Sequence, residues 1–310
     1  MSTKILIDTD PGIDDAMAIL FALRYPELEV VGLTTVVGNV EVEVATQNAL
    51  RLVELEGNDH VPVVRGAARP LAKASIRLGK HVHGEDGMGE TNLPLPKGKP
   101  LGIPAAQFIV ESVMAYPGEI TLVPIGPLTN LALALQLEPQ ISMRVKEVVL
   151  MGGAATVPGN ASPVAEANIY RDPHAASIVF AAGWAVTQVG LDATSRCIMT
   201  KAYLDELRLA DNPASELLGR MLPFYQDFYA NTFGLAGGIY TNDFSAIAYV
   251  LDPSLFRTES WPLYVETEGR CAGQTIPDRR SQWGNLPVIN VCLEVDASRL
   301  TALYKKHLTR

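Results

Sequence analysis

The segment that most constrains the fold is residues 5–18, ILIDTDPGIDDAMA. Its three leading apolar residues predict a buried strand, and Pro11-Gly12 predicts a turn. Apolar residues then recur at helical spacing from Ala16 to Leu23. The chain is therefore expected to open with a strand, a tight turn and a helix.

Four carboxylates fall within positions 8–15 of this segment. Asp8 and Asp10 are two residues apart and face the same side of a strand. Asp14 and Asp15 lie in the first helical turn, beside the positive end of the helix dipole. Carboxylates this close repel one another unless a cation lies among them, and oxygen-only ligands favour calcium or magnesium over zinc. The turn is therefore a candidate metal site.

Two other interpretations of this acidic turn remain open. For a single aspartate, such as Asp8 or Asp14, capping of the helix is the simpler explanation, because one cap needs one carboxylate. An Asp-x-Asp pair at a strand end is also typical of magnesium-dependent phosphotransferases that form an aspartyl phosphate. That chemistry needs a phosphate-binding loop and a downstream lysine, and neither stands out in the sequence.

Predicted strands and helices alternate along most of the chain. The expected strands are 30–37, 61–64, 120–125, 148–151 and 185–191, and the expected helices are 42–55, 104–116, one opened by Pro127 and one opened by Asp172-Pro173. Such alternation predicts a parallel sheet that binds its ligand at the carboxyl ends of the strands.

The C-terminal part departs from this alternation. Residues 200–251 are mainly helical in pattern, and strands near 263–266 and 288–295 and a last helix at 297–307 follow. No linker, repeat or low-complexity tract divides the sequence. We therefore predict one domain, 1–310, with an α/β fold: a mostly parallel central sheet, helices on both faces and a helical cap near the C-terminal half.

Composition excludes several classes of partner. The formal net charge is −9 and there is no run of Lys and Arg, which argues against nucleic-acid binding. The two longest uncharged runs, 120–137 and 173–191, contain Pro, Gly, Asn or Gln, so we expect no membrane span. Three widely spaced cysteines fit neither a disulfide framework nor a zinc site. We expect a cytoplasmic protein that acts on a small molecule.

Several blocks resemble one family. The segment 8–16, DTDPGIDDA, is similar to the amino-terminal signature of the inosine-uridine preferring nucleoside hydrolases. Further blocks resemble that family in the same order: Gly38-Asn39, His83-Gly84-Glu85-Asp86-Gly87, residues 125–130 (IGPLTN), Met151-Gly152-Gly153 and residues 166–173 (EANIYRDP). The resemblance implies a nucleoside hydrolase-like fold and calcium-dependent cleavage of the N-glycosidic bond of ribonucleosides, giving free base and ribose.

The resemblance also implies a calcium site and a general base. The ion would be held by Asp10, Asp15, Asp243 and the main-chain carbonyl of Ile125. Carboxylates stabilise an oxocarbenium-like transition state, and an ion-bound water loses its proton more easily. Asp10 or Asp14 is expected to accept that proton, and we favour Asp10.

The remaining site residues fall into a sugar set and a base set. The sugar set implied by the resemblance comprises Asp14, Asn39, Met151, Asn160, Glu166 and Asn168. In loops, Asn more often bonds its own backbone, so this is the commoner role of each Asn in general. For the base we expect His83, and, on a predicted helix from 214 to 232, Tyr225, Gln226 and Tyr229. Aromatic residues at i and i+4 on a helix are as often part of a core.

One position departs from the family pattern. Family members typically carry His immediately before the last metal-binding Asp, and here that residue is Asn242. An amide cannot act as a general acid, but it can donate a hydrogen bond to a departing base. Asn242 is therefore kept as a catalytic and base-binding candidate, and a nucleoside-binding protein with lost turnover is the alternative function. The resemblance further suggests a homo-oligomer, either a dimer or a tetramer.

Overall fold

The computed structural model describes residues 2–309. The fold is built around one nine-stranded sheet. Its strands are β1 (Thr3–Thr9), β2 (Leu28–Thr35), β3 (Val63–Arg65), β4 (Ile120–Pro124), β5 (Glu147–Met151), β6 (Val186–Val189), β9 (Phe256–Val265), β10 (Thr275–Pro277) and β11 (Val288–Val295). The strand order is β10-β9-β11-β6-β5-β4-β1-β2-β3. A separate antiparallel pair is formed by β7 (Ile198–Met199) and β8 (Ile239–Tyr240).

The sheet is parallel except at one edge. Strand β1 pairs in parallel with β2 and β4, and parallel pairing continues through β5 and β6 to β11. Only β9 and β10 run antiparallel to their neighbours. The predicted α/β fold with a mostly parallel sheet is confirmed, and the carboxyl ends of β1, β2, β4 and β5 lie at the same edge.

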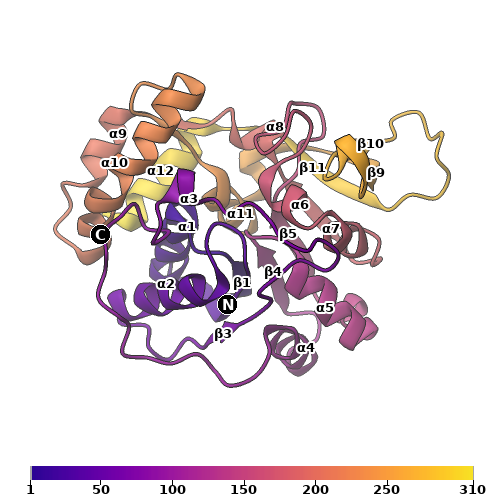
Figure 1. Ribbon diagram of the computed structural model, residues 1–310, viewed down its shortest axis with the longest axis horizontal. Helices are drawn as coiled ribbons and strands as arrows, with labels where there is room; N and C mark the ends of the chain where they lie inside the picture. The colour runs from indigo at the N-terminus through magenta and orange to yellow at the C-terminus, as the bar shows by residue number, and fades with distance from the viewer. Residues whose placement is uncertain (1, 310) are drawn as a thin grey trace.

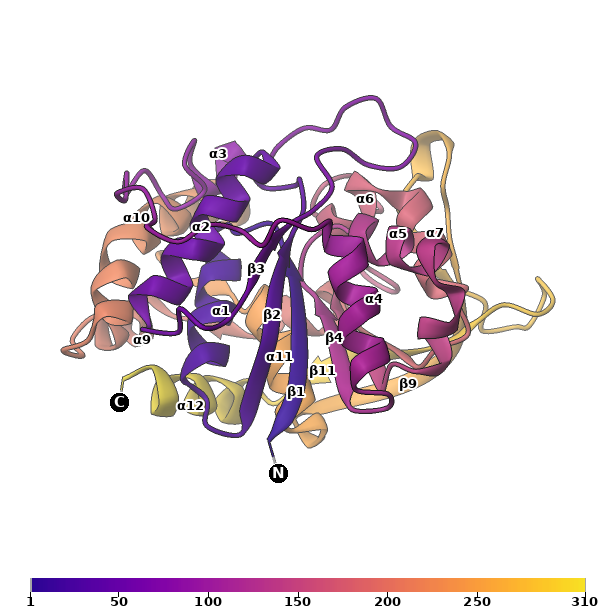
Figure 2. The same cartoon turned by 90° about the horizontal axis from the view of Figure 1, so that it is seen from below.

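Helices cover both faces of the sheet. They are α1 (Ile13–Arg24), α2 (Val42–Leu55), α3 (Lys80–His83), α4 (Ala105–Ala115), α5 (Thr129–Leu137), α6 (Ala167–Arg171), α7 (Pro173–Phe180), α8 (Leu191–Thr194), α9 (Lys201–Leu207), α10 (Pro213–Phe233), α11 (Asn242–Leu251) and α12 (Ala297–Leu308). Figure 2 shows strands β1 to β4 between α1 and α2 on one side and α4 on the other.

Alternate residues of each buried strand serve two apolar cores. In β1, Ile5 and Ile7 belong to the core beneath α1, α2 and the C-terminal helices, whereas Leu6 belongs to the core beneath α4, α5 and α7. All three side chains are fully buried, as expected for a strand covered on both faces. Helices α9, α10 and α12 gather at one end of the molecule and form the predicted cap, and the loop after β10 projects from the other end (Figure 1).

Several strand ends differ from the sequence prediction by one or two residues, and β9 differs by more. The strand predicted near 263–266 is the end of β9, which begins at Phe256. Its first half, FRTES, has one apolar residue and three exposed ones, so it carries little apolar pattern. The loop from 66 to 102 contains one helical turn, α3. Among residues 2–309, no helix is long and apolar enough to cross a membrane.

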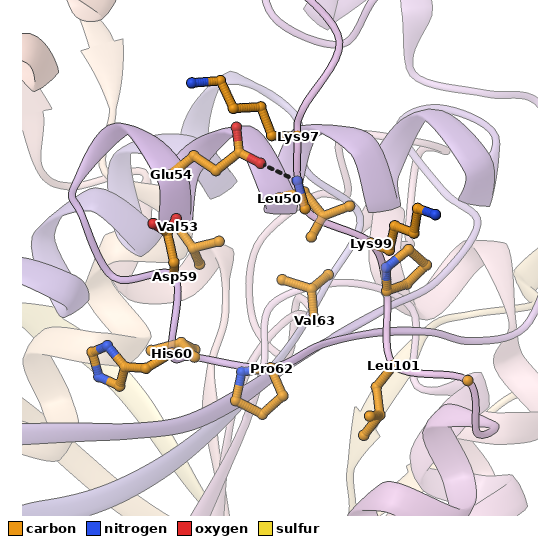
Figure 3. A pocket seen from close by; sticks show the side chains of 14 residues that line it. Leu50, Val53, Glu54, Asp59, His60, Pro62, Val63, Lys97, Lys99 and Leu101 are labelled. Carbon is orange, nitrogen blue, oxygen red and sulfur yellow. Dashed lines mark hydrogen bonds between the residues drawn. The ribbon is translucent and has the colours of Figure 1, made fainter.

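A hollow of about 730 Å³ lies away from the carboxyl ends of the strands, beside the last turns of α2 and the segment 97–102 (Figure 3). Lys97 and Lys99 flank it, and the Glu54 carboxylate accepts a hydrogen bond from the Gly98 backbone N–H at 2.6 Å. This hollow contains none of the residues proposed for chemistry from the sequence.

Candidate active site

A cavity of about 560 Å³ opens where the parallel strands end. Asn39, Ile125 and Met151 line it, and these residues follow β2, follow β4 and end β5. The other walls come from the first turn of α1, from α3, from α6 and its preceding loop, and from α10 and α11. Segments from the whole length of the chain therefore meet at the edge of the sheet where parallel α/β proteins bind ligands.

Asp15 is the residue that caps α1, although the sequence offered Asp8 and Asp14 for that role. One Asp15 oxygen accepts a hydrogen bond from the N-cap backbone N–H of Gly12 at 3.0 Å, and the other accepts one from the Thr9 hydroxyl at 2.5 Å. Burial, followed by repulsion from Asp14, raises the pKa of Asp15 to about 6. Capping of α1 therefore accounts for Asp15 alone, and the other three carboxylates of the turn need another explanation.

Asp8 lies in β1 and is bonded to β2 and to α5. Its Oδ1 accepts hydrogen bonds from the Thr34 hydroxyl at 2.6 Å and from the Asn130 amide at 2.7 Å. Burial raises the pKa of Asp8 to about 7, and these two hydrogen bonds oppose the rise. Asp8 therefore joins three segments of the fold.

Asp10 is fully buried and fits closely between two glycines. A Cβ on Gly38 would lie 2.0 Å from Asp10 Oδ2, and a Cβ on Gly126 would lie 2.6 Å from Oδ1. This explains why glycine precedes Asn39 and follows Ile125. Burial, followed by repulsion from Asp15, raises the pKa of Asp10 well above its usual value. Oδ1 is buried without a hydrogen-bond partner, so it can serve a ligand.

Asp243, in the first turn of α11, completes the acidic cluster. One carboxylate oxygen from each of Asp14, Asp15 and Asp243 lies within 4.8 Å of the others. Burial, followed by repulsion from Asp14, raises the pKa of Asp243 well above its usual value. Because Asp14 Oδ1, like Asp10 Oδ1, is buried without a partner, the donor set fits a hard cation bound through oxygen. The cluster can hold a metal ion.

All the residues predicted for the sugar line the cavity. These are Asp14, Asn39, Met151, Asn160, Glu166 and Asn168. Glu166 also caps α6, since its carboxylate accepts hydrogen bonds from the backbone N–H groups of Asn168 at 2.8 Å and Ile169 at 3.1 Å. Burial raises the pKa of Glu166 above its ordinary value. The amide of Asn168 donates to the Ile125 carbonyl at 2.7 Å, so the predicted metal-binding carbonyl is directly beside the sugar set.

A polar cluster of Asp14, Tyr225, Tyr229 and Asn242 also lines the cavity. The hydroxyl of Tyr225 and the amide of Asn242 donate to Asp14 Oδ2 at 2.8 and 3.3 Å. The Asn242 amide also donates to the Tyr229 hydroxyl at 3.1 Å, while its oxygen accepts from the Thr194 hydroxyl at 3.2 Å. Burial, followed by repulsion from Asp14, raises the pKa of each tyrosine, so both hydroxyls stay protonated and act as donors.

His83, at the end of α3, stacks on the Tyr225 ring with the ring centroids 5.4 Å apart. Its Nδ1 accepts a hydrogen bond from the Ile13 backbone N–H at 3.1 Å. Burial lowers the pKa of His83 to about 4, the nearby Asp14 opposing and Arg171 assisting the shift. The imidazole is therefore neutral near pH 7 and keeps its proton on Nε2, which makes it a hydrogen-bond donor and a poor general acid.

Gln226 does not line the cavity, unlike the other predicted base contacts. Its amide donates to the Gly237 carbonyl and its oxygen accepts from Arg208, so the side chain ties α10 to neighbouring segments. Sequence reasoning missed Arg171 and Phe228, which do line the cavity. Arg171 belongs to the block 166–173, but no spacing rule showed where its side chain points.

Such a fold and site define an α/β enzyme with an acidic, oxygen-rich cavity for a small polar ligand. The sequence profile of the inosine-uridine preferring nucleoside hydrolases matches residues 5–302. The chain is 44% identical over 283 residues to the inosine-uridine preferring nucleoside hydrolase of Leishmania major, covering 90% of this chain and 89% of that protein. It is 41% identical over 314 residues to uridine nucleosidase 1 of Arabidopsis thaliana, covering 99% and 93%.

Solved structures agree with these relatives. A plant nucleoside hydrolase superposes with a TM-score of 0.96 at 38% identity, covering 100% of this chain and 99% of that one. A purine-preferring ribonucleoside hydrolase from Gardnerella vaginalis gives a TM-score of 0.94 at 34% identity, covering 99% and 98%. The chain belongs to the inosine-uridine preferring nucleoside hydrolase family and is an N-glycosyl hydrolase.

Proposed function

We propose that this protein hydrolyses the N-glycosidic bond of ribonucleosides to free base and ribose with the help of one calcium ion. The observation that carries the proposal is the convergence of Asp14, Asp15 and Asp243 within 4.8 Å of one another. Asp14 and Asp243 of this cluster line the cavity of about 560 Å³. The relatives are named for uridine, inosine or purine nucleosides. These substrates all contain ribose, but they differ in the base.

The ion is proposed to bind Asp10, Asp15, Asp243 and the Ile125 carbonyl. A calcium ion there would grip two ribose hydroxyls and make a water molecule more acidic. Burial and then mutual repulsion raise the pKa of Asp10, Asp15 and Asp243, and a bound cation would offset both effects, which supports this assignment. Calcium suits a set made only of oxygen ligands.

The proton of the attacking water is proposed to go to Asp10 or Asp14. Each has one buried oxygen without a hydrogen-bond partner. We favour Asp10, because a carboxylate that holds the ion can also accept the proton. Oδ2 already accepts hydrogen bonds in Asp10 and in Asp14 alike. The carboxylates also stabilise the positive charge that develops on the sugar as the bond breaks.

The base is proposed to leave toward His83, Tyr225, Tyr229 and Asn242. Near pH 7 these residues offer an imidazole N–H, two phenolic hydroxyls and an amide. All of these groups donate hydrogen bonds, and none of them is an effective general acid. The departing base is then stabilised as an anion by hydrogen bonds. The family His at position 242 is not required for this route, so we prefer turnover to the alternative of a protein that only binds nucleosides.

One experiment tests the proposal. Inosine, adenosine, uridine and cytidine are incubated with the protein, with and without a chelator, and reducing sugar is measured. We expect sugar release that the chelator abolishes. Binding of nucleosides without release would favour the binding protein, and magnesium-dependent release of phosphate from a nucleotide would favour the phosphotransferase.

The segments 76–90 and 223–240 are proposed to close over the base during cleavage. Stacking of His83 on Tyr225, and an edge contact between His81 and Phe228 with ring centroids 5.9 Å apart, support this proposal. Helix α3 packs against α10 beside the cavity. Assembly into a dimer or tetramer and a cytoplasmic location stay predictions.

A further inference from the structure

Arg171 is a cation inside the cavity that the proposed reaction does not use. It is the last residue of α6, and only 10% of its side chain is exposed. Nη1 lies 3.3 Å from Asp10 Oδ2 and 3.4 Å from Asn168 Oδ1, and Nη2 lies 2.8 Å from Asn39 Oδ1. One guanidinium group therefore links a proposed metal ligand to two proposed sugar contacts.

The chemistry of these partners fixes how the two amides are turned. A guanidinium group only donates hydrogen bonds, so the oxygens of Asn39 and Asn168 must face Arg171. Their NH2 groups then face acceptors, Asp15 Oδ2 at 3.0 Å for Asn39 and the Ile125 carbonyl at 2.7 Å for Asn168. Arg171 therefore holds the oxygen end of each amide, and without it only the nitrogen end of each amide would be held.

The backbone on both sides of Arg171 is held in place. Glu166 caps the start of α6. Asp172 caps α7 through the Ala175 N–H at 3.1 Å and also accepts hydrogen bonds from the Thr129 hydroxyl at 2.7 Å and the Leu71 N–H at 2.9 Å. The five residues of α6 therefore have little freedom, and the guanidinium group is presented to the cavity from a fixed base.

We propose that Arg171 is a positioning residue for ribose: it holds Asn39 and Asn168 in the one amide orientation that recognises the sugar hydroxyls. This inference rests on the proposed function, because it assumes that the sugar lies against these amides. Sugar contacts of this kind are made in the ground state and in the transition state, so their loss raises KM more than it lowers kcat. A site built around hydroxyl groups also discriminates strongly against analogues that lack them.

The test compares Arg171→Met with the wild type on a ribonucleoside and on its 2′-deoxy, 3′-deoxy and 5′-deoxy analogues. We expect KM for the ribonucleoside to rise about tenfold or more, with a smaller change in kcat. The preference for the ribonucleoside over at least one deoxy analogue should fall by about tenfold or more. Arg171→Lys keeps the charge but not the forked donor, and should restore part of that preference.

A matched control is Arg69→Met, which removes the same charge from an exposed residue that does not line the cavity. It should leave the preference between ribonucleoside and deoxy analogues unchanged. Unchanged preference in Arg171→Met, or an equal loss of kcat/KM on all four substrates, would overturn the inference, because either result means that Arg171 does not act through sugar recognition.

A second readout needs no ligand. In ¹⁵N spectra, the side-chain NH2 signals of Asn39 and Asn168, assigned with the Asn39→Ala and Asn168→Ala variants, should exchange slowly in the wild type and rapidly in Arg171→Met. Equally slow exchange in both proteins would disprove the positioning role. If the wild type released no sugar but the signals responded as expected, the proposed function would fail while the orientation of the amides by Arg171 would stand.

Discussion

Tyr225 in α10 donates a hydrogen bond of 2.8 Å to Asp14 in the first turn of α1. The two residues are separated by 211 positions in the sequence, and this bond joins helix α10 to the acidic turn after β1. Asp14 Oδ2 is thereby occupied, whereas Oδ1 is buried without a partner. The bond from Tyr225 therefore orients the Asp14 carboxylate and leaves its unpaired oxygen, Oδ1, available to a ligand.

Replacement of Tyr225 by Phe should weaken catalysis without unfolding the protein. A hydrogen bond to a charged group contributes about 1.5 to 3 kcal/mol, so kcat/KM should fall roughly 10- to 100-fold. Steady-state kinetics on inosine and uridine measure this. Tyr203→Phe is the matched control, since its hydroxyl bonds the Thr301 carbonyl away from the cavity. Equal activities of the two variants would show that the bond to Asp14 is not used.

Replacement of Asn242 by His should raise turnover most for nucleosides whose base leaves poorly. The side chain at this position contacts Tyr229 and Asp14, so an imidazole here could provide the acid that the cavity lacks. The measurement is kcat for inosine relative to a nitrophenyl riboside, whose leaving group needs no proton. A decrease on every substrate would indicate instead that Asn242 is adapted to its own chemistry through its bond with Thr194.

Removal of the proposed calcium ion should abolish activity. It should also lower the melting temperature by several degrees, because the buried carboxylates lose their shared counter-ion and because the ion binds only the folded protein. Calorimetry with and without a chelator measures the shift. Asp243→Asn should show little response to the chelator, whereas Asp59→Asn, an exposed control, should respond like the wild type. A melting temperature that ignores the chelator would argue against the ion.

Asp8 should make stability fall as pH rises. Its folded-state pKa of about 7 exceeds the ordinary value of 3.8, so the folded protein keeps a proton that the unfolded chain has released. This contribution to stability is full below about pH 3.8 and is lost as pH rises toward 7. Asn at this position cannot titrate. The free energy of unfolding of Asp8→Asn relative to the wild type should therefore increase by a few kcal/mol from pH 4 to 7, because a shift of about three pKa units corresponds to an energy of that order.

Urea unfolding at several pH values, with chelator present, checks the Asp8 prediction. Asn at this position keeps an oxygen for Thr34 and Asn130, the two donors that Asp8 Oδ1 accepts. It also places an NH2 group where Asp8 Oδ2 is buried without a partner. A constant difference in the free energy of unfolding across this pH range would mean that Asp8 titrates normally.

Much of the fold follows from local patterns. The predicted helix 42–55 is α2, and the polar residues that follow the predicted strands, among them Asn39, line the cavity as parallel pairing requires. Strand β9 was predicted at less than half its length, because its first half, FRTES, is mostly polar and largely exposed. Periodicity detects a strand that is buried on both faces more readily than one at an antiparallel edge.

The site was predicted less completely than the fold. Family blocks identified the lining residues, but Gln226 in one predicted segment points away from the cavity while Arg171 in another points into it. Neither outcome is visible in one-dimensional spacing. Which rotamer a side chain adopts depends on the partners that distant segments bring to it, here Gly237 for Gln226 and Asn39 for Arg171.

The sequence alone determined the alternating strands and helices, the acidic turn after the first strand and the kinds of ligand that its oxygens could bind, because these depend on residues near one another in the chain. The family resemblance alone had pointed to Asp243, and the tertiary structure brings it to that turn. Only the tertiary structure decided that Asp15 doubles as a helix cap and that Arg171 orders two amides. Such roles depend on distances of a few ångströms between segments far apart in sequence, which chain folding sets.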